Sequence, residues 1–162
     1  MSDYVCEPLG KQHDRAQFDC GVLVLNEYLT KYANQDLKRK AAAVFVMVDR
    51  DVPKRVIGFY TLCATSVELS SLPTELIKRL PCYPEILVGR LARDIGYPGL
   101  GALLLSDAIT RCVRVANEIA ASLIVVDSKG EAATRFYEKF GFISLPKLTD
   151  RMFLPMRTAE KL

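Results

Sequence analysis

The sequence predicts a mixed α/β (α+β) fold, in which helices cover a sheet. Three observations support this prediction. Apolar residues recur at helical spacing in three separate stretches, and short β-rich segments lie between them. One continuous apolar run, "SLIVVDS", is typical of a strand that is covered on both faces. The expected order of elements favours an antiparallel first half and a strand–helix–strand unit in the second half.

The first half of the chain is expected to form an edge strand, a helix and a hairpin. Residues 4–9 are the edge strand, and the amphipathic stretch behind them predicts one long helix that ends in a basic cluster. The segments "AAAVFVMVD" and "RVIGFYTLCATSVEL" predict two paired strands, because Asp51 and Pro53 between them suit a turn. The expected inward positions of the long helix are Leu25, Leu29, Tyr32 or Ala33, and Leu37.

The second half alternates helices and strands. "SSLPTELIKRL" predicts a short helix capped by Ser71 or Thr74, and "EILVGRLARD" predicts the strand that follows. A longer helix is expected from about Leu100 to Ala116, and "EAATRFYEKFGF" predicts another that Gly141 ends as a left-handed C-cap. "FISLP" and "RMFLPM" complete the chain as one or two strands. The expected inward positions of the longer helix are Leu104, Leu105, Ala108, Ile109 and Cys112.

Composition limits the class of protein. With 162 residues, 50% of them hydrophobic and 25% charged, the chain is expected to be one globular domain over residues 1–162. No run approaches the roughly 18 apolar residues of a membrane span, and no apolar core follows a basic start, so we expect a cytoplasmic protein with no membrane partner. The 5 cysteines form no CxxC pair, which favours reduced, packed thiols over disulfides or a metal site. The net charge of +3 neither requires nor excludes nucleic acid.

A glycine-rich segment, "GYPGLG", lies between a predicted strand and the helix that begins near Leu100. Backbone N–H groups at a helix start have no intrahelical partner and attract phosphate, and glycine lets a phosphate reach them. A tight turn without a ligand is the alternative interpretation. No Lys-Ser/Thr pair follows to make a nucleoside-triphosphate loop, and no acidic residue ends the next strand as in a dinucleotide fold, unless Asp127 serves.

Three stretches and the succession of elements resemble the GNAT-type N-acetyltransferases. "GYPGLG" matches the pyrophosphate loop of that family, and "FYEKFGF" matches the segment after its last core helix. "FDCGVLVLNEYL" combined with "VGRLARD" is similar to the subgroup of toxins that acetylate aminoacyl-tRNA. The resemblance covers about Phe18 to Pro155. It implies one GNAT domain with a largely antiparallel sheet of six or seven strands, about four helices, and a V-shaped split beside the fourth strand.

The resemblance also implies where acetyl-coenzyme A (acetyl-CoA) binds, with no metal. The backbone of the fourth strand would hold the thioester and supply an N–H to the oxyanion, and the glycine loop would bind the pyrophosphate through backbone N–H groups. Gly96 stands where the family has Gln or Arg, and Gly130 stands where many members have an Asn that contacts pantetheine. The implied cofactor-binding residues are Leu91, Ala92, Arg93, Gly96, Tyr97, Pro98, Gly99, Leu100, Gly101 and Ala102.

Tyr137, in "FYE", is the catalytic proton donor that the resemblance implies. A phenol with a pKa of about 10 stays protonated at neutral pH and can protonate a departing thiolate. The alternative interpretation is packing, because Ala133, Phe136, Tyr137 and Phe140 form a helical stripe.

The acceptor is expected to be an α-amine, because no general base stands out. His13, the one histidine, lies in a polar stretch and is expected at the surface. An α-amine titrates at about 7.7 to 8, whereas a lysine amine at about 10.4 would need far more help to lose its proton. Arg90 and Arg93 lie nearest the expected thioester, opposite Leu91 if the pleat is regular. We expect Arg90 to contact the acceptor stem of tRNA. A tRNA substrate needs several basic clusters on the side where its amine enters, whereas any single cluster is most simply a solvated face. The clusters are Lys38-Arg39-Lys40, Lys54-Arg55, Lys78-Arg79, Arg90 with Arg93, and Arg111 with Arg114.

The leading hypothesis is therefore an acetyl-CoA-dependent toxin that acetylates the α-amine of aminoacyl-tRNA and blocks translation. Its expected partners are charged tRNA and, as the toxin subgroup implies, a small ribbon–helix–helix antitoxin, while a homodimer stays open. One alternative is an acetyltransferase of a small amine or a protein N-terminus. The other, from a different class, is a non-catalytic acyl-CoA sensor.

Overall fold

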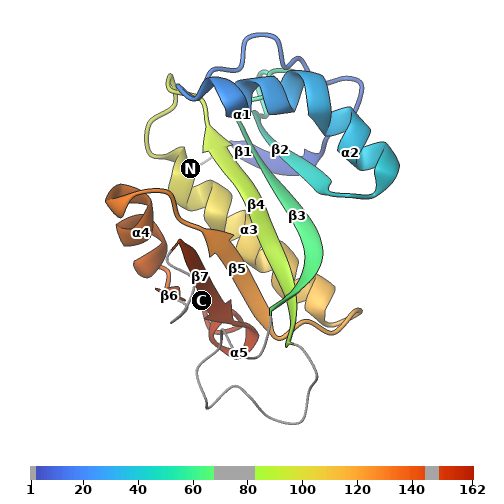
Figure 1. Cartoon of the computed structure of the whole chain (residues 1–162). Helices are drawn as coiled ribbons and strands as arrows, with labels where there is room; N and C mark the ends of the chain where they lie inside the picture. The colour runs from blue at the N-terminus through green and yellow to red at the C-terminus, as the bar shows by residue number, and fades with distance from the viewer. Residues whose placement is uncertain (1–2, 68–82, 145–149) are drawn as a thin grey trace. The chain divides into compact units, whose positions relative to one another are not determined.

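The computed structural model describes residues 3–67, 83–144 and 150–162 (Figure 1). The chain divides into two compact units, one made of residues 1–63 and 89–108 and the other of residues 64–88 and 109–162. The short helix predicted in "SSLPTELIKRL" lies outside the described residues. Within the described ranges, no helix is long and apolar enough to cross a membrane.

Seven strands in the described part of the chain form one sheet. In spatial order they are β1 (Tyr4–Pro8), β2 (Ala43–Asp49), β3 (Gly58–Val67), β4 (Tyr83–Arg93), β5 (Leu123–Asp127), β7 (Arg151–Pro155) and β6 (Ile143–Ser144). The pairs β1–β2, β2–β3, β5–β7 and β6–β7 are antiparallel, and β4–β5 is parallel. The predicted mixed, largely antiparallel sheet is therefore confirmed, as are the edge strand and the hairpin.

The helices of the described chain are α1 (Leu23–Glu27), the π-helical segment η1 (Tyr28–Tyr32), α2 (Ala33–Arg39), α3 (Leu100–Ala116), α4 (Glu131–Glu138) and α5 (Met156–Ala159). The bounds of α3 confirm the prediction. One long helix was expected where α1, η1 and α2 lie, and the difference is the π-helical turn, which takes an extra residue. Leu29 and Ala33 are fully buried as expected, but the extra residue turns Tyr32 outward, to 51% exposure.

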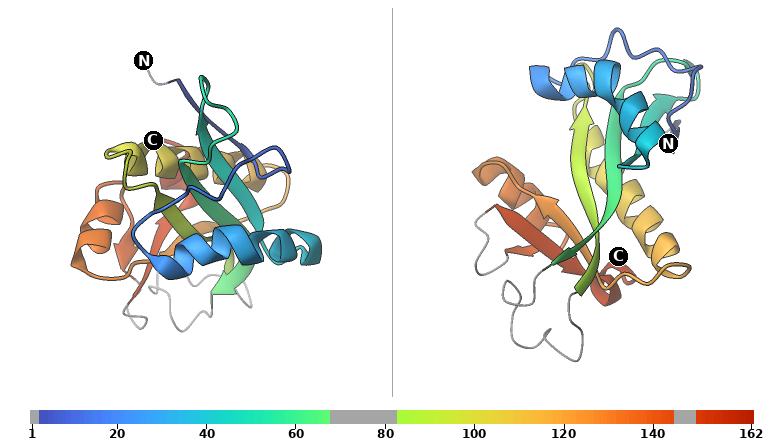
Figure 2. Two further views of the ribbon diagram at one scale, coloured as in Figure 1. Left: turned by 90° about the horizontal axis from the view of Figure 1, so that it is seen from above. Right: turned by 45° about the vertical axis from the view of Figure 1, so that its right-hand side comes forward.

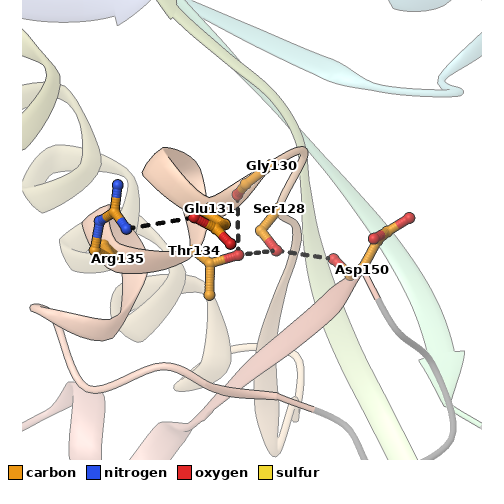
Figure 3. Close-up of a pocket in the computed structure, with 6 residues that line it drawn as sticks. All are labelled: Ser128, Gly130, Glu131, Thr134, Arg135 and Asp150. Carbon is orange, nitrogen blue, oxygen red and sulfur yellow. Dashed lines mark hydrogen bonds and ion pairs between the residues drawn. The ribbon is translucent and has the colours of Figure 1, made fainter.

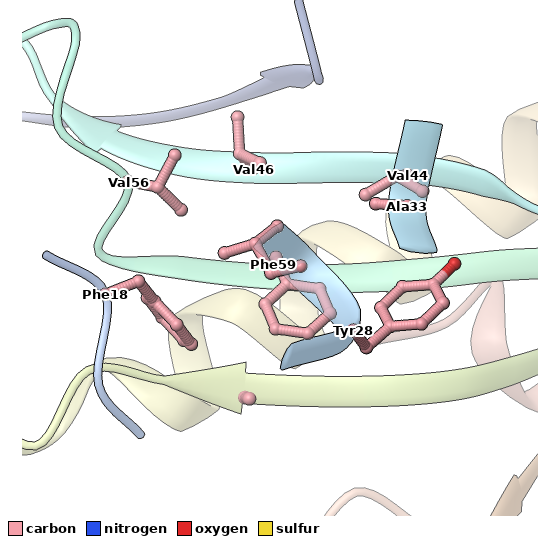
Figure 4. Packing of buried hydrophobic residues seen from close by; sticks show 9 residues of the cluster. Phe18, Tyr28, Ala33, Val44, Val46, Val56 and Phe59 are labelled. Carbon is pink, nitrogen blue, oxygen red and sulfur yellow. The ribbon is translucent and has the colours of Figure 1, made fainter. Parts of the chain in front are cut away.

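The core of the first unit lies between the hairpin and the helical segment (Figure 4). Phe59 of β3 is central to it. Its ring meets Phe18 edge-on, with centroids 5.5 Å apart, and stacks on Tyr28 with centroids 6.1 Å apart. Val46 faces Phe59 in the β2–β3 register and is also fully buried. Burying these side chains therefore fixes where α1 and η1 lie on the sheet.

The other face of β3 meets the first turns of α3 (Figure 2). Side chains alternate along a strand, so Gly58 and Tyr60 point away from Phe59. A Cβ at Gly58 would lie 3.4 Å from a methyl carbon of Leu104, and the Tyr60 hydroxyl donates to the Asp107 carboxylate at 2.5 Å. These contacts position the N-terminal end of α3, into which the glycine loop leads.

The second unit is centred on β5, whose residues from Leu123 to Val126 are all buried, as the continuous apolar run predicts. The parallel ladder with β4 runs from Glu85 opposite Leu123 to Val88 opposite Val126. β4 continues to Arg93 beyond this ladder.

The helix α4 ends at Glu138, and the turn that closes it reaches Gly141, the predicted left-handed residue, which has a φ of +97°. The N–H of Gly141 donates to the carbonyl of Glu138 at 3.0 Å, and the N–H of Phe142 donates to the carbonyl of Tyr137 at 3.3 Å. This is the Schellman arrangement, which needs a left-handed residue and so favours glycine.

Candidate functional site

The glycine loop, residues 94–101, joins β4 to α3 and is held by the buried carboxylate of Asp94. Its Oδ1 accepts the N–H of Gly96 at 2.9 Å, and its Oδ2 accepts the N–H of Asp19 at 3.1 Å. The carbonyl of Asp19 in turn accepts the N–H of Ile95 at 2.8 Å. The loop is therefore tied to the segment just before α1. Sequence analysis missed Asp94, because its partner lies 75 residues away.

The structure narrows the set of loop N–H groups that can reach a phosphate. The turn uses the N–H of Gly96 and also that of Tyr97, which donates to the Asp94 carbonyl at 3.1 Å, and Pro98 has no N–H. The N–H groups in the first turn of α3, from Leu100 to Ala102, have no intrahelical acceptor. The predicted phosphate-binding set is thereby reduced to Gly99, Leu100, Gly101 and Ala102.

Gly99 is needed in this loop because of its backbone conformation. Its φ is +87°, a region that residues with a Cβ rarely adopt. Among the described residues other than its two chain neighbours, no atom lies within 4 Å of the place where a Cβ would stand, so a ligand can approach the backbone there.

A cation from the β2–β3 connection lies beside the loop. The guanidinium of Arg55 is 5.6 Å from the centre of the Tyr97 ring. Its Nε is buried and has no hydrogen-bond partner among the described residues. A buried donor without an acceptor is costly, and a phosphate oxygen would supply one. In the sequence, Arg55 stood out only as part of a basic pair with Lys54.

The end of β4 presents Arg90 and Ala92 to the helical segment. Ala92 is 7% exposed and belongs to the cluster around Phe59. The guanidinium of Arg90 lies 3.6 Å from the centre of the Tyr28 ring. The tyrosine is a functional candidate that sequence analysis missed, since it lies at the flank of the predicted apolar stripe.

Arg93 does not share this face. It lies three positions after Arg90, so the alternation of a regular strand places it with Leu91 on the opposite face. Its Nη1 donates to the carbonyl of Asp94 at 3.2 Å, next to the loop. The expectation that Arg90 and Arg93 both face away from Leu91 on a regular strand is therefore wrong for Arg93, because residues three positions apart on a continuous strand lie on opposite faces.

Tyr137 lies on α4 in the second unit and is 9% exposed. Its ring contacts Phe136 and Phe142, with centroids 5.3 and 5.6 Å away. Burial raises the pKa of Tyr137 to about 12, and the negative charge of Asp127 acts in the same direction. The side chain is therefore packed, and its hydroxyl stays protonated at neutral pH.

A pocket of about 330 Å³ opens at the start of α4 (Figure 3). The hydroxyl of Thr134 donates to the Gly130 carbonyl at 3.1 Å and also lies 3.1 Å from the hydroxyl oxygen of Ser128, so these polar groups of the wall are already paired. Gly130 has φ +94° and ψ 166°, a combination open almost only to glycine. This backbone explains why no Asn stands there. The lining residues are Ser128, Gly130, Glu131, Thr134, Arg135 and Asp150.

The expectation that His13 lies at the surface is wrong. The residue is 6% exposed, and its Nδ1 accepts the N–H of Gly10 at 2.9 Å. Its Nε2 must then carry the proton, and it lies 2.7 Å from Oε1 of Glu7. Both ring nitrogens are occupied, so His13 supports the local fold and offers no free nitrogen to a substrate.

Known proteins resemble this chain over nearly its full length. A tRNA-acetylating toxin of Mycobacterium tuberculosis (strain ATCC 25618 / H37Rv) is 36% identical over 152 residues, which cover 92% of this chain and 90% of that protein. The chain belongs to the tRNA-acetylating toxin family of GNAT acetyltransferases. No model of a protein family matches it.

Solved structures of such toxins share the fold. AtaT complexed with acetyl-methionyl-tRNAfMet is 26% identical, with a TM-score of 0.90 and coverage of 98% of each chain. A mutant AtaT toxin bound to the C-terminus of the antitoxin AtaR and to acetyl-CoA is 25% identical, with a TM-score of 0.83 and coverage of 99% of this chain and 98% of the other. Family membership confirms the GNAT fold that the glycine loop and "FYEKFGF" implied.

Proposed function

We propose that this protein transfers the acetyl group of acetyl-CoA to the α-amine of aminoacyl-tRNA and thereby blocks translation. The observation that supports this most is the 36% identity to a tRNA-acetylating toxin over 92% of the chain. Residues 1–162 act together as one GNAT domain. We also propose that the protein works in the cytoplasm, where charged tRNA is found, and that a small ribbon–helix–helix antitoxin restrains it.

Acetyl-CoA binds at the glycine loop in this proposal. The N–H groups from Gly99 to Ala102 and the positive end of the α3 dipole bind its pyrophosphate. Gly96 has no side chain to contribute, and Arg55 beside Tyr97 supplies the cation in its place. The unpaired Nε of Arg55 gains an acceptor when the phosphate binds.

The acceptor amine needs no base from the protein. The α-amine of an aminoacyl ester has a pKa below the ordinary α-amino range of about 7.7 to 8.0, so most of it is neutral at physiological pH. This agrees with the burial of His13, whose two ring nitrogens are already hydrogen-bonded. Most of the rate enhancement then comes from holding the amine and the thioester in the right geometry.

Transfer requires a donor for the oxyanion and a proton for the leaving thiolate. Backbone N–H groups of Leu91 to Arg93 stabilise the oxyanion, and Tyr137 protonates the sulfur as the C–S bond breaks. The amine loses its surplus proton to solvent. Because the pKa of Tyr137 is about 12 and that of a thiol is about 8.5, proton transfer to a thiolate that has already departed would be unfavourable by about 5 kcal/mol, and the tyrosinate that transfer leaves is protonated again by solvent. The proton therefore moves in concert with C–S cleavage.

The proposal is tested with the purified chain, radiolabelled acetyl-CoA and three acceptors: charged tRNA, the same amino acid as a free amine, and a short peptide. We expect label in charged tRNA alone, and we expect its loss when the aminoacyl ester is hydrolysed. Equal labelling of the free amino acid or the peptide would support the small-amine or N-terminus alternative. Binding of acetyl-CoA without transfer to any acceptor would support the sensor.

A further inference from the structure

Arg90 has one face of its guanidinium against the ring of Tyr28, and the residue is only partly buried. The guanidinium carbon lies 3.6 Å from the centre of the Tyr28 ring, which is a stacking distance. A stacked guanidinium keeps its five N–H donors in its own plane, directed away from the ring. Among the described residues, none forms a hydrogen bond or ion pair with Arg90. The group is thus oriented while no described residue takes up its donors.

Tyr28 is itself held from three sides. It is 5% exposed, and its ring lies nearly parallel to that of Phe59, at an interplanar angle of 18° (Figure 4). Its hydroxyl donates to Oδ2 of Asp36 at 2.8 Å. Donation to a carboxylate increases the electron density of the ring and so strengthens its attraction for a cation. Burial and the hydrogen bond to Asp36 raise the pKa of Tyr28, which keeps the hydroxyl protonated as a donor.

We propose that Tyr28 is a positioning residue, which holds Arg90 edge-outward for a phosphate of the charged tRNA acceptor. The inference rests on the proposed function, because it takes charged tRNA as the substrate. A guanidinium edge matches two phosphate oxygens at once, and an arginine that is held in place before binding loses less conformational freedom on contact. Tyr28 is the first residue of the π-helical turn, and this turn places the Tyr28 ring against Arg90.

The test compares Arg90→Ala, Tyr28→Leu and the double variant with the parent chain. Steady-state KM and kcat for charged tRNA are measured, with the slope of log binding constant against log salt concentration. Each phosphate contact contributes about 0.7 to 0.9 to that slope. We expect each single variant to raise KM by about 3- to 30-fold with kcat within about 2-fold of the parent. The magnitude of the salt slope should decrease by the contribution of about one phosphate contact. The double variant is expected to be no worse than Arg90→Ala.

Two controls separate positioning from packing. Phe18→Leu removes an aromatic ring from the same cluster without touching Arg90, so it should lower stability and leave the salt slope unchanged. Tyr28→Phe keeps the ring and its packing but loses the bond to Asp36, so its KM should fall between those of the parent and Tyr28→Leu. The KM of Tyr28→Phe therefore tests the inference even if Tyr28→Leu does not fold.

Three outcomes decide the inference. If Tyr28→Leu and Tyr28→Phe both keep the parental KM and slope while Arg90→Ala loses them, Tyr28 does not position Arg90. If Arg90→Ala also behaves as the parent does, Arg90 makes no phosphate contact and the inference falls, while acetylation of charged tRNA by the parent still stands. If the parent chain does not acetylate charged tRNA, the proposed function itself is wrong.

Discussion

Arg151 lies beside a buried carboxylate, with its Nη1 3.8 Å from Oε1 of Glu85. The same guanidinium donates from Nε and Nη2 to the two oxygens of Asp127, at 2.8 and 3.0 Å. The side chain of Glu85 is fully buried, and neither of its oxygens has a hydrogen-bond partner in the described chain. Burial raises the pKa of Glu85 to about 7, although Arg151 opposes the change.

This raised pKa predicts that stability falls as pH rises. The ordinary pKa of Glu85, about 4.5, applies to the unfolded chain, so between about pH 4.5 and 7 the folded chain binds more protons than the unfolded chain. The free energy of unfolding should therefore decrease across this window, by roughly 2 to 3 kcal/mol, since one pKa unit corresponds to about 1.4 kcal/mol. Urea denaturation at several pH values measures it.

The matched variants for this prediction are Glu85→Gln and Glu131→Gln. Glu85→Gln should flatten the decrease, because the amide does not titrate. Glu131 has a side chain that is 93% exposed, so its variant should follow the parent. If Glu85→Gln shows the same pH dependence as the parent, another group is responsible.

Tyr137→Phe separates catalysis from packing. The variant keeps the ring between Phe136 and Phe142, so it should fold, with a stability loss of about 1 kcal/mol at most. Turnover of charged tRNA should fall by about 10² to 10⁴, the usual effect of losing a general acid, with unchanged affinity for acetyl-CoA. Turnover at the parental rate would leave Tyr137 with a packing role only.

The pH profile of the parent enzyme follows from the same pKa. Activity should rise as the acceptor amine loses its proton, at or below about pH 8. No descending limb should appear up to about pH 10, because the pKa of Tyr137 is about 12. A descending limb near pH 8 to 9, retained in Tyr137→Phe, would indicate a different acid.

Substitution of Gly101 tests the loop. Gly101 lies in the first turn of α3, where an acidic side chain stabilises the helix and glycine weakens it. Gly101→Glu should therefore raise or preserve thermal stability and abolish acetyl-CoA binding in calorimetric titration. Gly101→Ala, the control without charge, should bind more weakly than the parent but measurably. Undiminished affinity of the folded glutamate variant would exclude the loop as the phosphate site.

Arg55→Ala tests the cation beside the loop. A charged hydrogen bond contributes about 1.5 to 3 kcal/mol, so the dissociation constant for acetyl-CoA should rise by about 10-fold or more. Lys54→Ala removes an exposed neighbouring cation and should change it by less than about 2-fold. Titration with dephospho-coenzyme A, which lacks the 3′-phosphate, identifies the phosphate that Arg55 contacts. If Arg55 contacts the 3′-phosphate, the parent and Arg55→Ala should bind this analogue with equal affinity. Equal affinities of parent and Arg55→Ala for acetyl-CoA would contradict the assignment.

Much of this fold could be predicted from local pattern. α3 and β5 agree with their predicted limits, because the helical spacing of the apolar residues in α3 and the continuous apolar run of β5 can each be recognised within the element alone. Gly141 could be predicted as a cap, since a left-handed residue after a helix favours glycine regardless of the rest of the chain.

The parts of the site that could not be predicted depend on contacts between distant segments. The spacing of apolar residues does not reveal the extra residue in the turn at Tyr28. That turn is stabilised by the packing of Tyr28 on Phe59, which belongs to another element. Arg55 and Tyr97 meet because the β2–β3 connection and the loop lie together, which no spacing reveals. His13 was misjudged because a polar stretch of sequence indicates a surface position, whereas its ring nitrogens bond to Gly10 and Glu7 of the same stretch.

The tie between Asp94 and Asp19 has a consequence for how long the protein survives. The loop takes its shape only when residues 75 positions apart meet, so the unfolded chain offers acetyl-CoA no site. By mass action, a ligand that binds only the folded chain stabilises it, by about 2.7 kcal/mol at one hundred times its dissociation constant. Acetyl-CoA then acts as a folding ligand as well as a substrate. When its concentration in the cell falls, a larger fraction of the chain opens to proteases, whether or not an acceptor is present.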